Sequence, residues 1–98
     1  MMNQFKNATK QSFERLEQYV PIVERVHGAN HPEFYDVRKL FDQINAKRKE
    51  SAVETPDIDN ELKQLREITD NYTIPGNVCE SYEAVYNMLS EIDEAYRA

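Results

Sequence analysis

The chain has 98 residues with two glycines and four prolines, and this shortage of turn-forming residues argues against an all-β fold. Its 40% of hydrophobic residues is too high for an obligately disordered chain, and its formal net charge of −6 disfavours binding to nucleic acid or anionic membranes. No apolar stretch is long enough to span a bilayer, and the first residues, MMNQFKNATK, lack the apolar core of a signal peptide. We therefore expect a small cytoplasmic helical protein.

The first predicted helix covers residues 3–27. Its apolar positions recur at intervals of three and four, which places Phe13, Leu16, Val20, Val23 and His27 on one stripe. Pro21 lies inside this pattern and lacks the N–H of an interior helical residue, so we expect a kink or a break there. Gly28 is typical of the position that follows a helix.

The second and third predicted helices cover residues 31–50 and 56–72. Pro32 and Pro56 fall in first turns, where proline is tolerated, and Thr55 is placed to cap the third helix. The stripe of the second helix consists of Phe34, Val37, Phe41 and Ile44. The stripe of the third helix consists of Ile58, Leu62, Leu65 and Tyr72.

The fourth predicted helix covers residues 77–97 and has the most regular period. Its stripe consists of Val78, Tyr82, Val85, Leu89, Ile92 and Tyr96. Four amphipathic helices with short connections predict an all-α, up-down-up-down antiparallel four-helix bundle, in a single domain over residues 1–98. A looser pair of helical hairpins that completes its core by dimerising remains the alternative.

His27 is the most informative polar residue, because a plain bundle would place an aliphatic side chain there. Glu24 precedes it by three residues, and a Glu-x-x-His spacing aims a carboxylate and an imidazole at one metal in di-iron bundle proteins. The competing interpretation is a histidine that caps carbonyl groups at a helix end. His31 is a weaker metal-ligand candidate, because Gly28 and Pro32 interrupt the helix that would align it with His27.

Cys79 is the single cysteine, so it cannot form an internal disulfide. Near the start of a helix its thiol is a candidate for reactivity, but with no basic partner visible we favour a small buried residue. The acidic runs at residues 57–61 and 91–94 are interpreted as solvated faces or helix-start charges.

Three stretches resemble the haemerythrin-like iron–sulfur cluster repair di-iron family, whose members are also described as regulators of cell morphogenesis and NO signalling. They are VERVH (residues 23–27), HGANHPEF (residues 27–34) and LREITDNYTIPGNVCESYEAVYNMLSEID (residues 65–93). The resemblance implies a four-helix bundle with two irons inside, and it assigns His27 to the position of an iron ligand.

The sequence departs from the family pattern at most other ligand positions. Lys6 stands where the family has a histidine, NAKRKES (residues 45–51) lacks the expected His-x-x-x-Glu, and Glu54 is followed by Thr55 rather than by histidine. The last ligand pair would lie beyond Ala98, and the resemblance does not extend to the cysteine-bearing N-terminal module of the family, which we expect to be missing. We therefore expect no complete di-iron site in one chain, although iron remains the expected metal, with His27, Glu24 and His31 as its predicted ligands.

By this resemblance, the predicted function is linked to iron–sulfur cluster repair or to the response to nitrosative or oxidative stress. No catalytic residue is assigned, and a non-enzymatic protein is favoured. The alternative is a metal-free protein-interaction module or a homodimer-forming helical domain. The expected partners are another protein or a second copy of the chain, and neither nucleic acid nor a membrane. A third possibility is a metal site shared by two copies, with Glu24 and His27 contributed by each.

Overall fold

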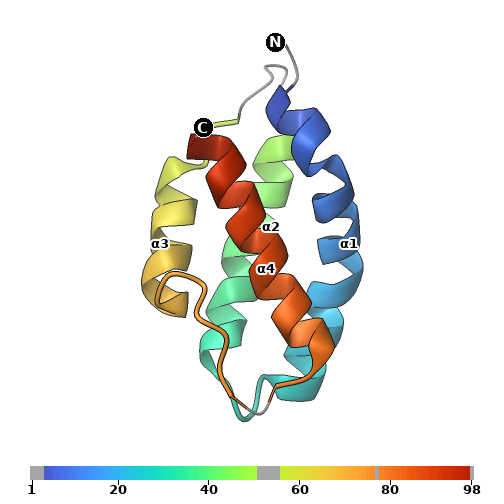
Figure 1. The fold of residues 1–98 in the computed structure, drawn as a ribbon, viewed down its shortest axis with the longest axis vertical. Helices are drawn as coiled ribbons and strands as arrows, with labels where there is room; N and C mark the ends of the chain where they lie inside the picture. Colours follow the sequence, from blue (N-terminus) through green and yellow to red (C-terminus); the bar gives the residue numbers. More distant parts are fainter. Residues whose placement is uncertain (1–3, 51–55, 77, 98) are drawn as a thin grey trace.

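The computed structural model describes residues 4–50, 56–76 and 78–97. They form four α-helices: α1 (Gln4–His27), α2 (Glu33–Glu50), α3 (Asp59–Thr69) and α4 (Glu80–Arg97). Successive helices run in opposite directions along the long axis of the molecule (Figure 1). The predicted all-α, up-down-up-down four-helix bundle is therefore confirmed, and the described ranges contain no strand.

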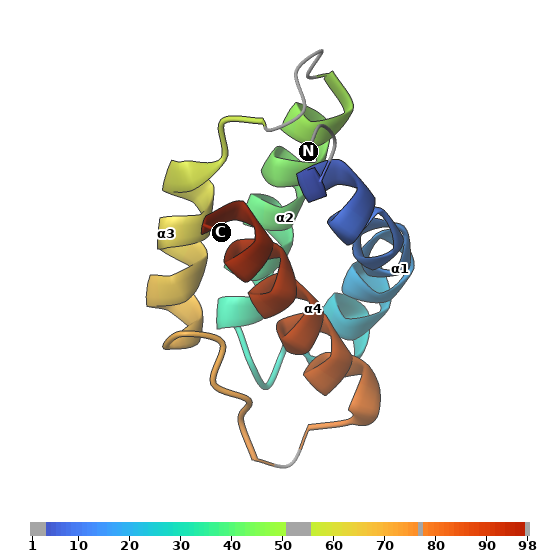
Figure 2. The same ribbon diagram turned by 45° about the horizontal axis from the view of Figure 1, so that its top comes forward.

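The helices pack as two antiparallel pairs joined through a third contact. The closest approaches are between α1 and α4, between α2 and α3, and between α1 and α2. In both ribbon views α1 and α3 lie on opposite sides of the bundle, with α2 and α4 between them (Figure 2). This arrangement encloses one hydrophobic core.

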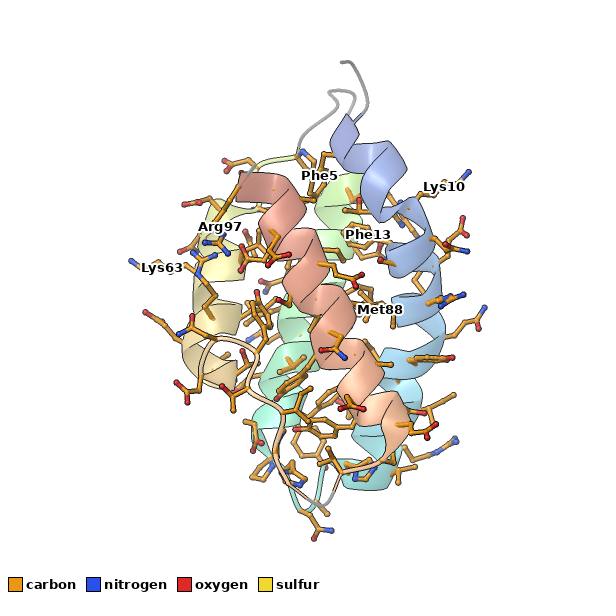
Figure 3. All side chains as sticks on the ribbon, in the orientation of Figure 1. Phe5, Lys10, Phe13, Lys63, Met88 and Arg97 are labelled. Atoms are coloured by element: carbon orange, nitrogen blue, oxygen red, sulfur yellow. The ribbon has the colours of Figure 1, made fainter. Side chains whose placement is uncertain are left out.

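The predicted apolar stripes form this core. Phe13 points between the helices while Lys10 and Lys63 extend outward (Figure 3). The α1 stripe is at most 1% exposed at Phe13, Leu16, Val20 and Val23. The other three helices contribute buried side chains at the predicted positions, including Phe34, Val37, Phe41, Ile44, Leu62, Leu65, Tyr82, Val85, Leu89 and Ile92. Burying apolar surface of this kind is the main favourable contribution to folding.

Pro21 lies inside α1, which continues through it to His27. The alternative in which this proline splits the helix is therefore wrong. The proline ring is exposed, so it meets solvent rather than the tightly packed core. Because proline has no backbone N–H, the carbonyl of Glu17, one turn earlier, lacks its usual helical hydrogen bond.

The third helix is shorter than the sequence predicts, because it begins at Asp59 rather than at residue 56 and ends at Thr69 rather than at 72. Ile58 precedes its first turn without a side-chain cap, and the predicted cap Thr55 lies outside the described residues. Asp70 ends the helix in the left-handed conformation, at φ 53°. Tyr72, predicted on the helical stripe, lies beyond the helix with φ 64°.

The other helix ends agree with the predicted ends within three residues, since α2 begins at Glu33 and α4 at Glu80. Among the described helices, none combines the length and the apolar character that crossing a bilayer requires.

Candidate functional site

One end of the bundle gathers most of the polar side chains that the sequence singled out. The C-terminal end of α1 supplies His27, and the following loop supplies His31. Glu33 is the first residue of α2, Cys79 directly precedes α4, and Tyr82 lies in the first turn of α4. The sequence alone did not connect Cys79 with His27, because 52 residues separate them.

The local backbone explains how α1 stops beside this site. The backbone N–H groups of Asn30 and His31 both donate to the carbonyl of His27, at 3.0 and 2.9 Å. A Cβ atom at Gly28 would lie 2.5 Å from the carbonyl oxygen of Glu24 and 2.7 Å from the Tyr35 ring. Gly28 is therefore required here for the close approach of Tyr35, and the chain turns toward α2 directly after it.

The central contact joins His27 Nε2 to the Cys79 Sγ atom at 3.0 Å. Either the thiol donates to the ring nitrogen or the ring N–H donates to sulfur, according to the tautomer. Cys79 is exposed, so the prediction of a small buried residue is wrong. The basic partner that the sequence did not reveal is His27, brought in from the other end of the chain by the pairing of α1 with α4.

The Tyr82 ring packs against the rings of both histidines. Its ring meets the His27 ring edge-on at 5.5 Å between centroids and the His31 ring at 5.3 Å. Its hydroxyl lies 3.2 Å from the Tyr86 hydroxyl and 3.4 Å from Glu33 Oε2. Burial raises the pKa of Tyr82 well above its ordinary value, and the bond to Tyr86 adds to the rise. Tyr82 is therefore a neutral, fully buried platform rather than an acid or base.

The predicted metal ligands do not converge on one point. His31 Nδ1 lies 3.4 Å from Glu33 Oε2, and its ring centroid is 6.4 Å from that of His27. Glu24 Oε1 accepts a hydrogen bond from Arg38 at 2.7 Å, so its carboxylate is already neutralised by a guanidinium.

The described residues do not supply the ligand set of a resident di-iron centre. Such a centre needs several carboxylates and imidazoles directed at the same space. In the described part of the chain, no group of three or more histidine, cysteine, aspartate and glutamate side chains is placed to hold a metal ion. The side chain at Lys6 and the residues 51–55, where the family pattern has further ligands, lie outside the described set. The assignment of His27, Glu24 and His31 to iron stays a prediction.

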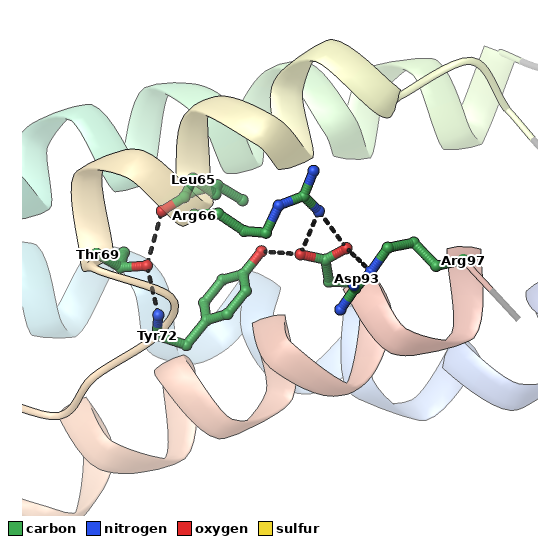
Figure 4. A network of polar contacts seen from close by, with 6 residues as sticks. All are labelled: Leu65, Arg66, Thr69, Tyr72, Asp93 and Arg97. Carbon is green, nitrogen blue, oxygen red and sulfur yellow. Dashed lines mark hydrogen bonds and ion pairs between the residues drawn. The ribbon is translucent and has the colours of Figure 1, made fainter.

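A second polar cluster lies between α3 and α4, around a carboxylate that sequence analysis placed on a solvated face. Asp93 is fully buried and accepts hydrogen bonds from Arg66, Arg97 and the Tyr72 hydroxyl (Figure 4). The signal was the spacing, because Asp93 lies four residues after Leu89 and three before Tyr96, on the face of α4 turned toward the core. Every one of these contacts is internal, so the cluster is structural.

The chain is similar to a distantly related curated protein. No family model matches the chain, and no solved structure matches it. The chain is 23% identical over 124 aligned positions to the iron-sulfur cluster repair protein ScdA of Staphylococcus haemolyticus. The alignment covers 95% of this chain and 56% of the relative, so the chain spans about half the length of the curated relative that it matches.

Proposed function

We propose that this protein takes part in the cytoplasmic repair of iron–sulfur clusters damaged by nitrosative or oxidative stress. The observation that carries the proposal is the alignment with a curated repair protein over 95% of the chain. An alignment of that extent covers the bundle as a whole rather than a single motif. The four-helix architecture supports the same relationship, because the family resemblance implies such a bundle.

In this proposal iron is cargo, or part of the damaged cluster, rather than a resident cofactor of one chain. The ion pair between Glu24 and Arg38 supports this division of roles, because it occupies a carboxylate that the predicted iron site would need. The protein then acts by contacting the damaged enzyme. Its exposed large hydrophobic residues, Ile22, Val26 and Tyr35, are suited to such a contact.

The direct test is the reactivation of a purified [4Fe–4S] dehydratase that nitric oxide or peroxide has damaged. Reactivation is followed in buffer with ferrous iron and dithiothreitol, with and without this protein. We expect the protein to speed recovery of activity, and a Val26→Ser variant to lose most of that effect. Lys10→Ala, at an exposed position of the same helix, is the matched control. A recovery no faster than in buffer alone would contradict the repair function.

Iron content and native mass, measured on the same anaerobically reconstituted sample, test the role of iron. We expect substoichiometric iron in the monomer. Iron near one or two per chain that His27→Ala abolishes would instead establish a built site. If that iron came with the mass of a dimer, the site would be one shared between two copies.

A second candidate function is a metal-free interaction module that forms a homodimer or binds a protein partner. The exposure of Ile22, Val26 and Tyr35, at 45, 59 and 50%, favours it. Sedimentation equilibrium over a range of concentrations distinguishes the homodimer, which Val26→Glu should dissociate. A monomer at every concentration removes the homodimer from consideration and leaves a different protein as the partner.

A further inference from the structure

The contact between Cys79 and His27 has the geometry of a nucleophile and its base. The sulfur and Nε2 are 3.0 Å apart, and the pair is exposed to solvent. Nucleophilic thiols in proteins are recognised by a base within hydrogen-bond reach that is itself oriented by a third group. Here the third group is Tyr82, whose fully buried ring packs edge-on against the imidazole.

The position of Cys79, directly before the first residue of α4, favours attack by its sulfur. The backbone N–H of Glu83 donates to the Cys79 carbonyl at 3.1 Å, so this cysteine occupies the N-cap position of α4. The positive end of a helix stabilises negative charge that develops there. Base and helix end therefore act on the same exposed sulfur atom.

We propose that Cys79 is a site of reversible S-thiolation, in which it exchanges with low-molecular-weight disulfides and His27 acts as the base. The thiol proton passes to Nε2 of His27 while Sγ attacks one sulfur of the disulfide. The S–S bond of the reagent breaks as the new Sγ–S bond forms. The leaving thiolate takes the proton from the imidazolium, so one thiol and one disulfide give one mixed disulfide and one thiol.

The charge around the thiol selects among disulfides. Glu80 and Glu83 lie in the first turn of α4, Glu33 lies beside His31, and the net charge of the chain is −6. These carboxylates repel an anionic reagent and attract a cationic one. The site is therefore suited to neutral or cationic disulfides rather than to oxidised glutathione.

The test is the rate of mixed-disulfide formation with cystamine, a cationic disulfide, at neutral pH, followed by mass spectrometry of the intact protein. His27→Gln should slow the reaction about tenfold or more. His31→Gln should leave it within about twofold, because Cys79 Sγ contacts His27, while His31 Nδ1 lies 3.4 Å from Glu33 Oε2. Cys79→Ser should abolish the reaction, because it is the single cysteine. Equal rates for wild type and a folded His27→Gln would overturn the proposal, and so would equal slowing by His31→Gln.

Two further measurements separate base catalysis from structural support. Added imidazole should restore much of the rate lost in His27→Ala, since it replaces the base without replacing the packing. The native chain should react faster than the same chain in denaturant, where Cys79 has no neighbouring imidazole. A native rate at or below the denatured rate contradicts activation, even if the His27 variants fail to fold.

Selection by charge is tested with oxidised glutathione. For each disulfide, the rate with the protein is divided by the rate with N-acetylcysteine, and this ratio should be lower for oxidised glutathione than for cystamine. Neither iron nor a client enzyme is present, so the result is independent of the repair assay.

Discussion

At the scale of single residues, Asp93 is a fully buried carboxylate whose hydrogen bonds join α3 to α4. Arg66 donates to both of its oxygens at 2.7 and 2.8 Å, and the Tyr72 hydroxyl donates at 2.8 Å. The bond to Asp93 raises the pKa of Arg66, while burial, followed by the same carboxylate, raises that of Tyr72. A buried charge is stable only when it is fully paired, so this cluster fixes the position of α3 against α4.

We expect Asp93→Ala to reduce the free energy of unfolding by about 3 kcal/mol, because it removes four charge-assisted hydrogen bonds and leaves Arg66 without its partner. Tyr72→Phe should cost about 1 kcal/mol. Arg97→Ala should cost less than about 1 kcal/mol, because that side chain is 58% exposed. Urea unfolding followed by circular dichroism measures all three. An Asp93 variant as stable as the Arg97 variant would contradict the structural role of the cluster.

Glu17 makes a contribution to the free energy of unfolding that depends on pH. Asn45 donates to its Oε2 at 2.7 Å and Lys49 lies 2.6 Å from the same atom, and these contacts lower the pKa of Glu17 below 4.5. Because the folded pKa is lower than the unfolded one, the stability is present above about pH 4.5 and is lost as the pH falls through the folded value. Wild type should therefore lose more stability between pH 6 and pH 3 than Glu17→Gln does. Parallel slopes in urea titrations of the two proteins would count against this assignment.

At the scale of elements, α1 contains the clearest conflict between local sequence and helix. Pro21 interrupts the hydrogen bonding of a helix that otherwise extends for 24 residues. The helix persists because the Phe13, Leu16, Val20 and Val23 stripe is buried along both sides of the proline. Packing on the core therefore outweighs a local backbone preference, as it does for most helices in proteins.

We expect Pro21→Ala to raise the free energy of unfolding by about 1 to 3 kcal/mol. The new N–H bonds the preceding turn, and the exposed position leaves room for the change. Gln18→Ala, at an exposed position one turn earlier, should change stability by no more than a few tenths of a kcal/mol. Thermal unfolding of the two variants gives the comparison, and an unchanged midpoint for Pro21→Ala would contradict a cost from the proline.

The end of α3 shows why element boundaries were harder to predict than element existence. The 3.6-residue period of Ile58, Leu62, Leu65 extends to Tyr72 in the sequence, but the chain leaves the helix at Asp70. Three successive residues then have positive φ, and Thr69 Oγ1 accepts the N–H of Tyr72 at 2.8 Å. Periodicity predicts which side chains face the core. Tyr72 faces the core as predicted, although it lies beyond the end of the helix.

At the scale of the whole molecule, three tyrosines that pack in or against the core make the stability of the bundle depend on pH in the alkaline range. Burial raises the pKa values of Tyr72, Tyr82 and Tyr86 above 10.0. The unfolded chain ionises these groups near pH 10 and the folded chain does not, so stability should fall as the pH rises above that value. Phenolate absorbance from these three residues should appear together with loss of the helical signal. Ionisation of Tyr82 before unfolding, detected by comparison with Tyr82→Phe, would contradict its burial.

The bundle as a whole was predictable from the sequence, because buried stripes on four amphipathic segments have few other ways to pack. The candidate site was predictable only in part. His27 was conspicuous as a polar residue on an apolar stripe, but its partner Cys79 is set by the approach of α1 to α4. The spacing of Asp93 from Leu89 and Tyr96 places it on the core-facing side of α4, but its partners Arg66 and Tyr72 come from a distant part of the sequence, so the run of acidic residues was interpreted as a solvated face.

The first and last helices also determine how the bundle would respond to force. The Phe5 ring, near the start of α1, meets the Tyr96 ring, near the end of α4, at 5.7 Å between centroids. Because the two helices are antiparallel (Figure 1), a load applied to these ends separates them one turn at a time instead of shearing the whole interface at once. The bundle should therefore open at low force from the Phe5–Tyr96 end, and the His27–Cys79 contact at the opposite end should be among the last parts of that interface to separate.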